Sequence, residues 1–219
     1  MSTPSGHEVR SAKTRAQLIE AAVNVIGAVG YEGASTRTLT KVANTPLSAI
    51  PYHFGGKKEL YLAAAQMIAD YARQRFDEVT KILDDDSTVG ATGATEKALH
   101  HLLHIILSDA EPHSWTSFVA RCAYENDEAF SLIHTQAIEP MMARLVQAAS
   151  AIPQSGLDGG AIRLRVNAVV TAIFSFRFLR GVIIRGMDWQ GMPEAGATAL
   201  RQMISDLCRS SFFPVRPLS

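Results

Sequence analysis

The chain has 219 residues, 47% of them apolar, and its 21 lysines and arginines balance 21 aspartates and glutamates. This apolar content is ample for a buried core, and the lack of net charge argues against a protein that coats nucleic acid or membranes through bulk electrostatics. The charge is unevenly spread, because residues 1–60 carry seven basic side chains against four glutamates. The N-terminal quarter therefore has a basic surplus, which the rest of the chain offsets.

Cysteine content and hydropathy predict a protein of a reducing compartment. The two cysteines, Cys122 and Cys208, both lie in apolar helical patterns, which argues against a disulfide scaffold. The opening ten residues lack the apolar segment of a secretory signal. The longest apolar run, residues 166–184, is interrupted by an asparagine and two arginines, which argues against a membrane span. We therefore expect a cytoplasmic protein without a membrane partner.

Helical spacing dominates the pattern of apolar residues, and no segment alternates convincingly at a period of two. We therefore predict an all-α protein of about nine helices. In chain order, the helices are predicted over residues 11–29, 36–43, a very short segment that begins at 45, then 57–83, 96–109, 113–125, 127–151, 159–186 and 193–212. Gly30 is a natural stop for the first helix, and Ser35 is expected to cap the second. Thr45 and Pro46 are expected to form the N-cap and first turn of the third.

Two further features interrupt the helical pattern. The stretch 84–95, DDDSTVGATGAT, is acidic, rich in glycine and non-periodic, and is predicted to be a loop. Pro140 lies inside the helix predicted over 127–151 and is expected to bend it.

The segment 43–46, ANTP, joins two short helices by a tight turn. Asn44 is the residue best suited, after glycine, to the positive φ that such a turn requires. Two short helices joined in this way form a helix-turn-helix, in which the second helix enters the major groove of DNA and the first crosses its backbone. In the following stretch, SAIPYHFGGKKEL, the aromatic residues can lie against sugar and phosphate, and the glycines let the backbone approach DNA. Lys57 then lies at the amide-rich start of the next helix, where anions bind.

Residues 18–61, LIEAAVNVIGAVGYEGASTRTLTKVANTPLSAIPYHFGGKKELY, resemble the DNA-binding domain of the TetR family of bacterial transcriptional regulators. Members of that family are helical homodimers that bind palindromic operators, usually as repressors, and release them when a small molecule binds a larger C-terminal domain. The resemblance implies a helix-turn-helix domain at 8–60 and a helical ligand-binding and dimerisation domain at 61–213. It also implies a cytoplasmic regulator without a cofactor, whose partners are a DNA operator, a small-molecule effector and a second copy of the chain.

The resemblance implies DNA contacts position by position. Phosphate contacts are expected at the start of the second helix and at the start of the long helix, groove contacts in and before the third helix, and backbone contacts at its end. The residues concerned are Ser35, Thr36, Arg37 and Lys57, then Thr45, Leu47, Ser48 and Ala49, and finally Tyr52 and His53. Two positions depart from the family pattern, since Pro46 replaces the usual serine and Pro51 the usual tyrosine. Pro51 lacks an amide hydrogen and biases Ile50 away from helical angles, so we expect a short or kinked recognition helix in which Tyr52 replaces the missing tyrosine.

The C-terminal half is expected to hold a dimer interface, because a palindromic operator requires a twofold-symmetric reader. The last two helices are the candidates, since one has a stripe of small residues and the other an apolar stripe, which together suit a close four-helix contact. The stripes consist of Ala168, Ala172 and Ser175 and of Leu200, Met203, Ile204 and Leu207. The same stripes are compatible with the core of a single chain, and their pattern does not separate the two interpretations.

A ligand cavity is expected where polar groups occur among large apolar residues. The segments SWTSFVARCAYEND and FSFRFLRG have that composition, and either of their central arginines could meet an anionic or polar ligand. The candidate lining residues are Trp115, Phe118, Arg121, Tyr124, Phe130, His134, Phe174, Arg177 and Phe178. Each of them, taken singly, is more often part of an ordinary core or, for the arginines, of a salt bridge.

Other functional classes find less support in the sequence. His100 and His104 lie one helical turn apart, as two metal ligands could, but no third ligand has a fitting spacing. We therefore expect exposed or hydrogen-bonded histidines and no metal. No nucleophile with a nearby base and no carboxylate pair stands out, so we do not expect an enzyme. The alternative is a helical small-molecule-binding protein that has lost DNA binding, with Pro51 as the lesion.

Overall fold

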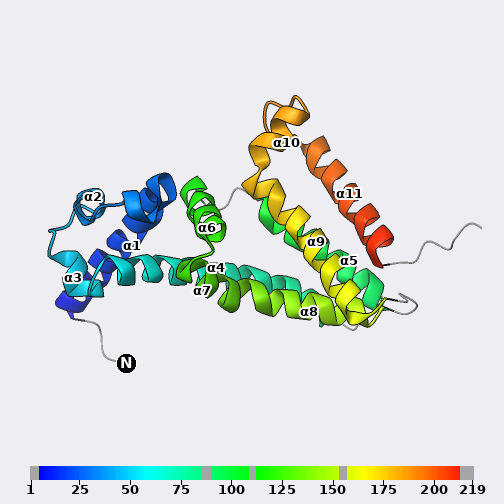
Figure 1. Ribbon diagram of the computed structural model, residues 1–219, viewed down its shortest axis with the longest axis horizontal. Helices are drawn as coiled ribbons and strands as arrows, with labels where there is room; N and C mark the ends of the chain where they lie inside the picture. The colour runs from blue at the N-terminus through cyan, green and yellow to red at the C-terminus, as the bar shows by residue number, and fades with distance from the viewer. Residues whose placement is uncertain (1–4, 85–89, 109–111, 153–156, 213–219) are drawn as a thin grey trace, which may run out of the picture. The chain divides into compact units, whose positions relative to one another are not determined.

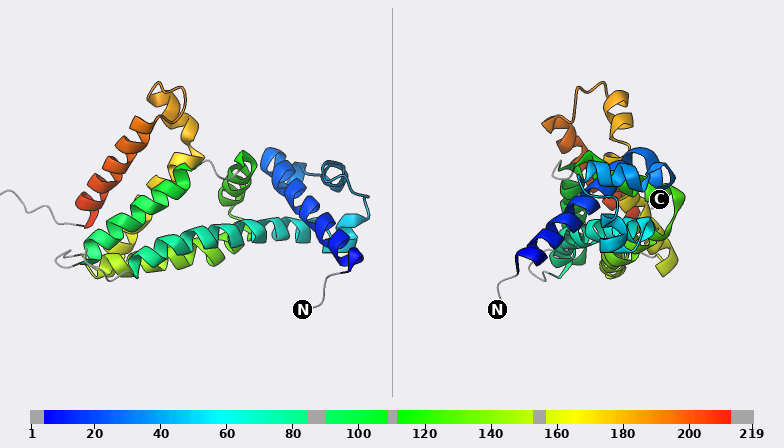
Figure 2. Two further views of the ribbon diagram at one scale, coloured as in Figure 1. Left: turned by 180° about the vertical axis from the view of Figure 1, so that it is seen from behind. Right: turned by 90° about the vertical axis from the view of Figure 1, so that its left-hand side faces the viewer.

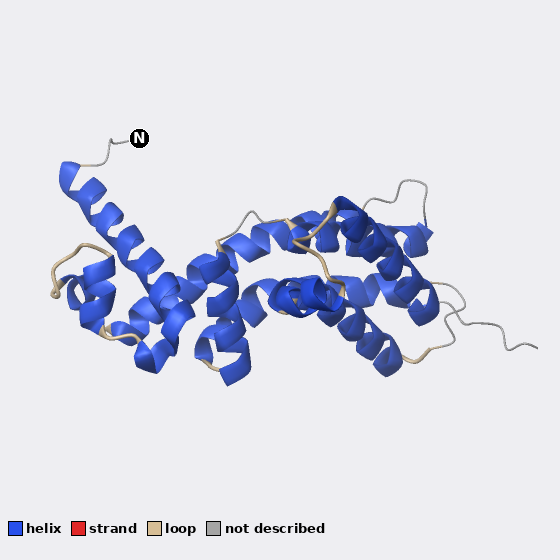
Figure 3. Cartoon of the chain, turned by 90° about the horizontal axis from the view of Figure 1, so that it is seen from above, coloured by secondary structure: helices blue, strands red, loops and turns tan. Residues whose placement is uncertain are grey.

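The computed structural model describes residues 5–84, 90–108, 112–152 and 157–212. These residues form helices and connecting turns (Figure 1), and they contain no strand (Figure 3). The prediction of an all-α fold is therefore confirmed. The elements are α1 (Gly6–Gly33), α2 (Thr36–Val42), α3 (Ala49–Phe54), α4 (Lys57–Leu83), α5 (Gly90–Leu107), α6 (His113–Glu125), α7 (Glu128–Ile133), the π-helical turn η1 (His134–Ile138), α8 (Glu139–Ser150), α9 (Gly159–Phe178), α10 (Arg180–Gly186) and α11 (Glu194–Phe212).

The chain divides into two compact units. The first comprises residues 1–71 and 111–136, and the second comprises residues 72–110 and 137–219. Helix α4 is continuous and contributes residues to both. The boundary expected at residue 60 divides the chain by function, into a DNA-binding and a ligand-binding domain, and it stays a prediction.

The first two helices confirm the predicted caps. Ser5 and Glu8 form a capping box at the start of α1, which explains why this helix begins before residue 11. Gly30 interrupts α1 with φ 78 and ψ 168, at the position predicted as its end. Ser35 caps α2 by accepting a hydrogen bond from the amide of Thr38.

The third helix begins later than predicted. Helix α3 starts at Ala49, and the Oγ1 of Thr45 is buried without a hydrogen-bond partner, so the prediction of Thr45 as its N-cap is wrong. The amide of Ala49 donates to the carbonyl of Pro46 over 2.9 Å, so Pro46 belongs to the turn that precedes the helix. Pro51 is the third residue of α3, where an amide hydrogen has no intrahelical acceptor to lose. The resulting helix has six residues, which confirms the expectation of a short recognition helix.

Local interactions account for the differences in the second half. Helix α5 begins at Gly90, so residues 90–95 are not a loop as predicted, whereas residues 85–89 lie outside the described residues. Its first turns contain two alanines, which are strong helix formers, and the buried hydroxyl of Thr95 finds its acceptor within the helix, at the carbonyl of Ala91.

Two helices predicted as continuous are interrupted. The segment 127–151 forms α7 and α8 with η1 between them. The wider π turn lies directly before Pro140, whose ring cannot fit against a regular preceding turn, so the bend expected there takes this form. The segment 159–186 forms α9 and α10, because Leu179 leaves helical geometry with φ −111 and ψ 23.

The core of the second unit consists of side chains from the second half of α4 and from α5, α8, α9 and α11, and Figure 2 shows the backbones of these helices. Its fully buried side chains include Leu102 of α5, Met141 of α8 and Ile173 of α9. Among the described residues, α9 is the one helix long and apolar enough to cross a membrane by length and composition. Its buried side chains, however, are part of this core, as in the central helix of a globular unit.

Candidate nucleic-acid interface

Helices α1, α2 and α3 share a small apolar core. Leu18, Leu39 and Ile50, one from each helix, are almost completely buried. The turn between α2 and α3 has Asn44 at φ 52, as predicted. The amide of Thr45 donates to the carbonyl of Thr40 over 2.9 Å. These contacts hold α3 at a set angle to α2, which is the arrangement of a helix-turn-helix.

Most of the predicted DNA contacts lie at the surface of this group. Ser35, Thr36, Arg37, Leu47, Ser48 and Tyr52 are exposed, whereas Thr45, His53 and Lys57 are half-buried. Ala49 is 7% exposed and belongs to the core, so the structure does not bring its side chain to the surface with the others. The exposed set combines hydroxyl groups, one guanidinium and an aromatic ring, which are groups that contact phosphate and sugar.

Arg15 holds the end of α3, a role that the sequence analysis missed. Its guanidinium carbon lies 4.3 Å from the centroid of the Phe54 ring, and its Nη1 donates to the carbonyl of His53. The ring of His53 meets Tyr52 edge to face at 4.8 Å. Tyr52 itself remains 73% exposed. Arg15 thus fixes the backbone at the end of the short helix while Tyr52 stays accessible.

The two lysines at the start of α4 have different surroundings. The Nζ of Lys58 lies 2.7 Å from the Oε2 of Glu128, and this hydrogen bond raises the pKa of Lys58. The Nζ of Lys57 instead lies 4.1 Å from the centroid of the Tyr31 ring, a cation–π contact. Within the described residues, Lys57 has no carboxylate partner. Of the two, Lys57 is the lysine whose charge is available to an external anion.

A buried polar group joins α4 to the turn between α6 and α7. The hydroxyl of Tyr61 donates to Oδ2 of Asp127 over 2.6 Å and lies 3.0 Å from the Sγ of Cys122. Asp127 in turn caps α7 by accepting from the amide of Phe130. Burial raises the pKa of Tyr61 and raises the pKa of Cys122 to about 12, so both groups are neutral at physiological pH. A buried, protonated thiol is a poor nucleophile, and the group therefore serves packing.

Helices α1 and α6 approach each other closely at Gly27. A Cβ at this position would lie 2.7 Å from the carbonyl oxygen of Ser114, on α6. Arg121 of α6 donates from Nε to the carbonyl of Gly27 and from Nη2 to that of Ala28, each over 2.8 Å. The break at Gly30 leaves such carbonyls without intrahelical partners. Arg121, predicted as a ligand contact, therefore completes the end of α1.

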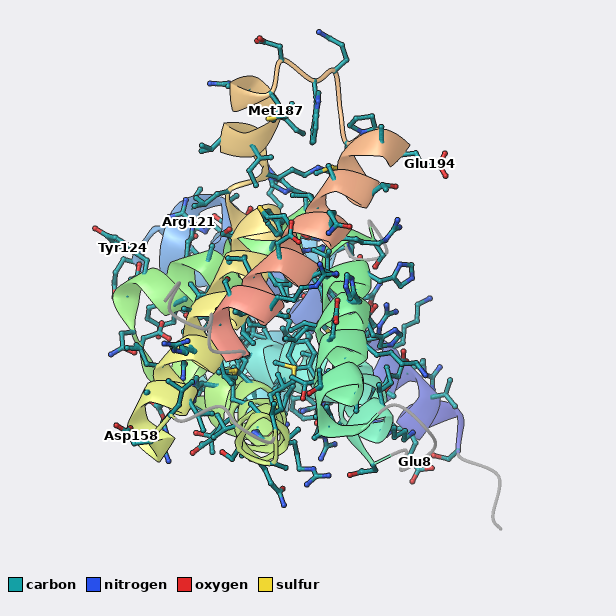
Figure 4. The ribbon with its side chains drawn as sticks, turned by 90° about the vertical axis from the view of Figure 1, so that its right-hand side faces the viewer. Glu8, Arg121, Tyr124, Asp158, Met187 and Glu194 are labelled. Carbon is teal, nitrogen blue, oxygen red and sulfur yellow. The ribbon has the colours of Figure 1, made fainter. Side chains whose placement is uncertain are left out.

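The other predicted ligand contacts fall into two groups. Trp115, Phe118, Tyr124, Phe130 and His134 belong to the first unit, as does Arg121, whereas Phe174, Arg177 and Phe178 belong to the second. Phe118 is fully buried beside Tyr61, and Tyr124 is 92% exposed and points outward (Figure 4). Phe130 and His134 form a ring pair, as do Phe174 and Phe178. The predicted aromatic residues therefore form separate ring pairs, while Tyr124 points outward, and their role toward a ligand stays a prediction.

The two stripes predicted for the dimer interface divide between core and surface. Leu200 and Ile204 are buried in the core of the second unit. Ala168 and Met203 are exposed, whereas Ala172, Ser175 and Leu207 are half-buried. The exposed face of α9 also includes Leu164, which is 72% exposed and was not predicted. An apolar surface therefore remains on these helices after the chain has folded.

The histidines of α5 behave as expected. Nε2 of His100 lies 2.8 Å from the hydroxyl of Ser205, and His104 is exposed. The described residues contain no group of three or more side chains suited to hold a metal ion.

Comparisons with known proteins agree with this arrangement. Residues 18–64 match the family of bacterial regulatory proteins named tetR, and residues 91–212 match the C-terminal domain of the HTH-type transcriptional dual regulator CecR. The CecR protein of Shigella flexneri is 26% identical over 205 residues, which cover 90% of each chain. The HTH-type nicotine-responsive transcriptional repressor HdnoR of Paenarthrobacter nicotinovorans is 38% identical over 77 residues, or 35% of this chain and 38% of that protein.

Solved structures show the same fold. A TetR-family regulator from Mesorhizobium loti superposes with a TM-score of 0.61 at 15% identity, over 92% of this chain and 96% of that one. A transcriptional regulator from Saccharomonospora viridis, solved in complex with choline, has a TM-score of 0.61 at 16% identity, over 91% and 97% of the two chains. The helix-turn-helix at the N-terminus and the match across more than half of the chain lead to one conclusion. The chain belongs to the TetR family of bacterial transcriptional regulators, with a C-terminal domain of the CecR type.

Proposed function

We propose that this regulator is a ligand-responsive repressor that binds a palindromic operator as a homodimer in the cytoplasm. The observation that carries the proposal is the exposed surface of the helix-turn-helix, where hydroxyl and guanidinium groups lie at the start of α2 and a hydroxyl and a phenol lie at and within α3. Curated relatives include proteins named as a dual regulator and as a nicotine-responsive repressor, which supports control of transcription by a small molecule.

The capped start of α2 and the start of α4 contact the DNA backbone in this proposal. Arg37 is exposed in the first turn of α2, close to free backbone amides that favour phosphate. Lys57 keeps its ammonium on the face of Tyr31, which leaves hydrogen-bond donors of the ammonium for a second phosphate. The major groove is contacted by Leu47 and Ser48, and the DNA backbone at its edge is contacted by Tyr52.

A second copy of the chain binds along α9 and α11. The outward side of α9 exposes Leu164, Ala168 and Thr171, which follow one another at spacings of four and three residues, and α11 exposes Met203. An apolar strip at this spacing suits helix packing across a twofold axis. The effector binds in the C-terminal domain of this dimer. Its binding favours a state in which the two helix-turn-helix domains have a different separation, and the continuous helix α4 transmits the change.

Loss of DNA binding is the less favoured alternative. The reason to expect such a loss is Pro51, because a proline that broke α3 would remove the recognition helix. Pro51 lies in the first turn of α3 and breaks no intrahelical hydrogen bond, and the amide of Gly55 still donates to its carbonyl over 3.0 Å.

Fluorescence anisotropy with DNA from upstream of the regulator's own gene tests the proposal. We expect sequence-specific binding that weakens steeply with salt, because phosphate contacts release counterions. Arg37→Ala and Lys57→Ala should each weaken binding to all sequences about equally and lower the salt slope by about one. Lys97→Ala, which removes an exposed lysine of α5, is the matched control and should bind as the wild type does. The absence of any specific, salt-sensitive binding would contradict the function, and an effect limited to one base pair would contradict the phosphate role.

A further inference from the structure

Arg75 occupies an unusual position on α4. The side of this helix that faces the core of the second unit carries Ala72, Phe76, Val79 and Leu83. Arg75 lies at the edge of the same stripe, one helical turn before Val79, which is completely buried. Arg75 is half-buried, and a guanidinium nitrogen that is taken out of water at such a position is costly unless it is paired, because the group cannot lose its charge.

No such pair is present within the described part of the chain. The Nε of Arg75 is buried and has no hydrogen-bond partner. Glu78 of α4 pairs with His101, Asp84 directly after α4 pairs with Arg144, and Asp77 is exposed on α4 without an ion pair to Arg75. Buried arginine nitrogens are normally satisfied, and a charged donor without a partner is a stronger candidate than a neutral hydroxyl for an acceptor from outside the chain.

Aromatic side chains adjoin this part of α4. The ring of Phe76, the residue after Arg75, lies 6.0 Å from that of Phe174, which lies 6.4 Å from that of Phe178. The row runs from a buried end at Phe76 to Phe178, which is 39% exposed. Arg177, in the same segment of α9, donates to the carbonyl of Ser108 over 3.0 Å. A row of rings that is accessible at one end, on two helices of which one also carries a guanidinium nitrogen without a partner, suits an amphiphilic anion.

We propose that Arg75 recognises the acidic group of the effector, and that the effector is an amphiphilic anion with an aromatic or apolar body. The guanidinium Nε and one Nη donate in parallel to a carboxylate or a similar planar or tetrahedral oxyanion, and the Phe76, Phe174 and Phe178 row packs against the body. This inference rests on the proposed function for the link to DNA, but the binding site itself does not depend on that link.

Two dyes with the same aromatic body separate the charge from the apolar contact. 8-Anilinonaphthalene-1-sulfonate carries an anionic group, and N-phenyl-1-naphthylamine is its neutral counterpart. Their affinities for the wild-type chain, Arg75→Gln and Lys81→Ala are measured by fluorescence titration, with circular dichroism as the test of folding. Lys81→Ala removes an exposed charge from the same helix and serves as the matched control.

The wild type should bind the sulfonate more tightly than the neutral dye. Arg75→Gln should weaken the sulfonate about 10- to 100-fold, the range of one lost charge-assisted contact, and leave the neutral dye within about twofold. Equal loss of both dyes in a folded variant, or unchanged binding of the sulfonate, overturns the proposal. If Arg75→Gln does not fold, the wild type decides, since a wild type without preference for the sulfonate overturns it as well. Anisotropy with the upstream DNA is run separately, so a failure of DNA binding leaves the dye result intact.

Discussion

The contact between α1 and α6 gives a prediction whose sign depends on packing. Replacing glycine by alanine inside an open helix stabilises it by about 1 kcal/mol, because glycine has more conformational freedom to lose. At Gly27 the added Cβ would lie 2.7 Å from the carbonyl oxygen of Ser114 and 3.2 Å from the amide nitrogen of Phe118. Both are backbone atoms, so the two helices must separate. Overpacking of this kind costs about 1–3 kcal/mol. We therefore expect Gly27→Ala to cancel the gain or to destabilise the chain by up to about 2 kcal/mol.

Thermal unfolding measures this difference against a matched substitution. A Cβ added at Gly181, in α10, would meet no atom within 4 Å, so Gly181→Ala should show the ordinary gain. For a chain of this size, 1 kcal/mol corresponds to about 2–4 °C in the melting temperature. Hydrogen exchange should also localise the loss for Gly27→Ala to the end of α1 and to α6. A rise in melting temperature equal to that of the Gly181 variant would refute the close contact.

The remaining predictions concern groups that the structure describes in detail. Arg121→Met should lower the free energy of unfolding by about 1–3 kcal/mol because two backbone carbonyls lose their donor, and urea unfolding should show Arg121→Lys to be intermediate. Thr45→Val removes a buried hydroxyl without a partner, so the same measurement should find it neutral or stabilising by up to about 1 kcal/mol. Burial raises the pKa of both Cys122 and Cys208 to about 12. The stability that the two protonated thiols contribute is therefore complete below their unfolded pKa of about 8.5, and it is lost as the pH rises toward 12. Unfolding measured from pH 8 to 11 should show this decline, and native thiols should resist alkylation at neutral pH. Tyr31→Phe should keep the affinity for DNA and its salt slope, whereas Tyr31→Leu should lower both by loss of the cation–π contact.

Local signals explain what the sequence could predict. The bounds of α4 and α6 agree with the prediction, because a pair of glycines precedes one and a proline precedes the other. Ser35 and Asn44 act through their own neighbours, as N-cap and as turn residue, so their roles could be read from residue type. Ser5 and Glu8 have the spacing of a capping box, so residue type also indicates the true start of α1, whereas the apolar periodicity begins only near residue 11.

Contacts between distant segments explain what the sequence could not predict. Arg121 and Gly27 are separated by 94 positions, and only the folded chain shows that one completes the other. The same holds for the hydrogen bond from Arg15 to the carbonyl of His53 and for the cation–π contact between Lys57 and Tyr31. Residue type indicated basic and aromatic groups that could meet a ligand or DNA. It did not indicate which of them are already engaged by the protein.

The discontinuity of the first unit has a consequence for biosynthesis and for dissection of the gene. The strip of α1 around Gly27 is covered by residues that are translated about a hundred codons later, in α6. A nascent or recombinant fragment that ends near residue 60 would leave this strip bare and the carbonyls of Gly27 and Ala28 without Arg121. Such a fragment would be prone to self-association through the uncovered helix. A recombinant DNA-binding domain should therefore retain α6 and α7, joined to it through a linker, rather than end directly after the helix-turn-helix.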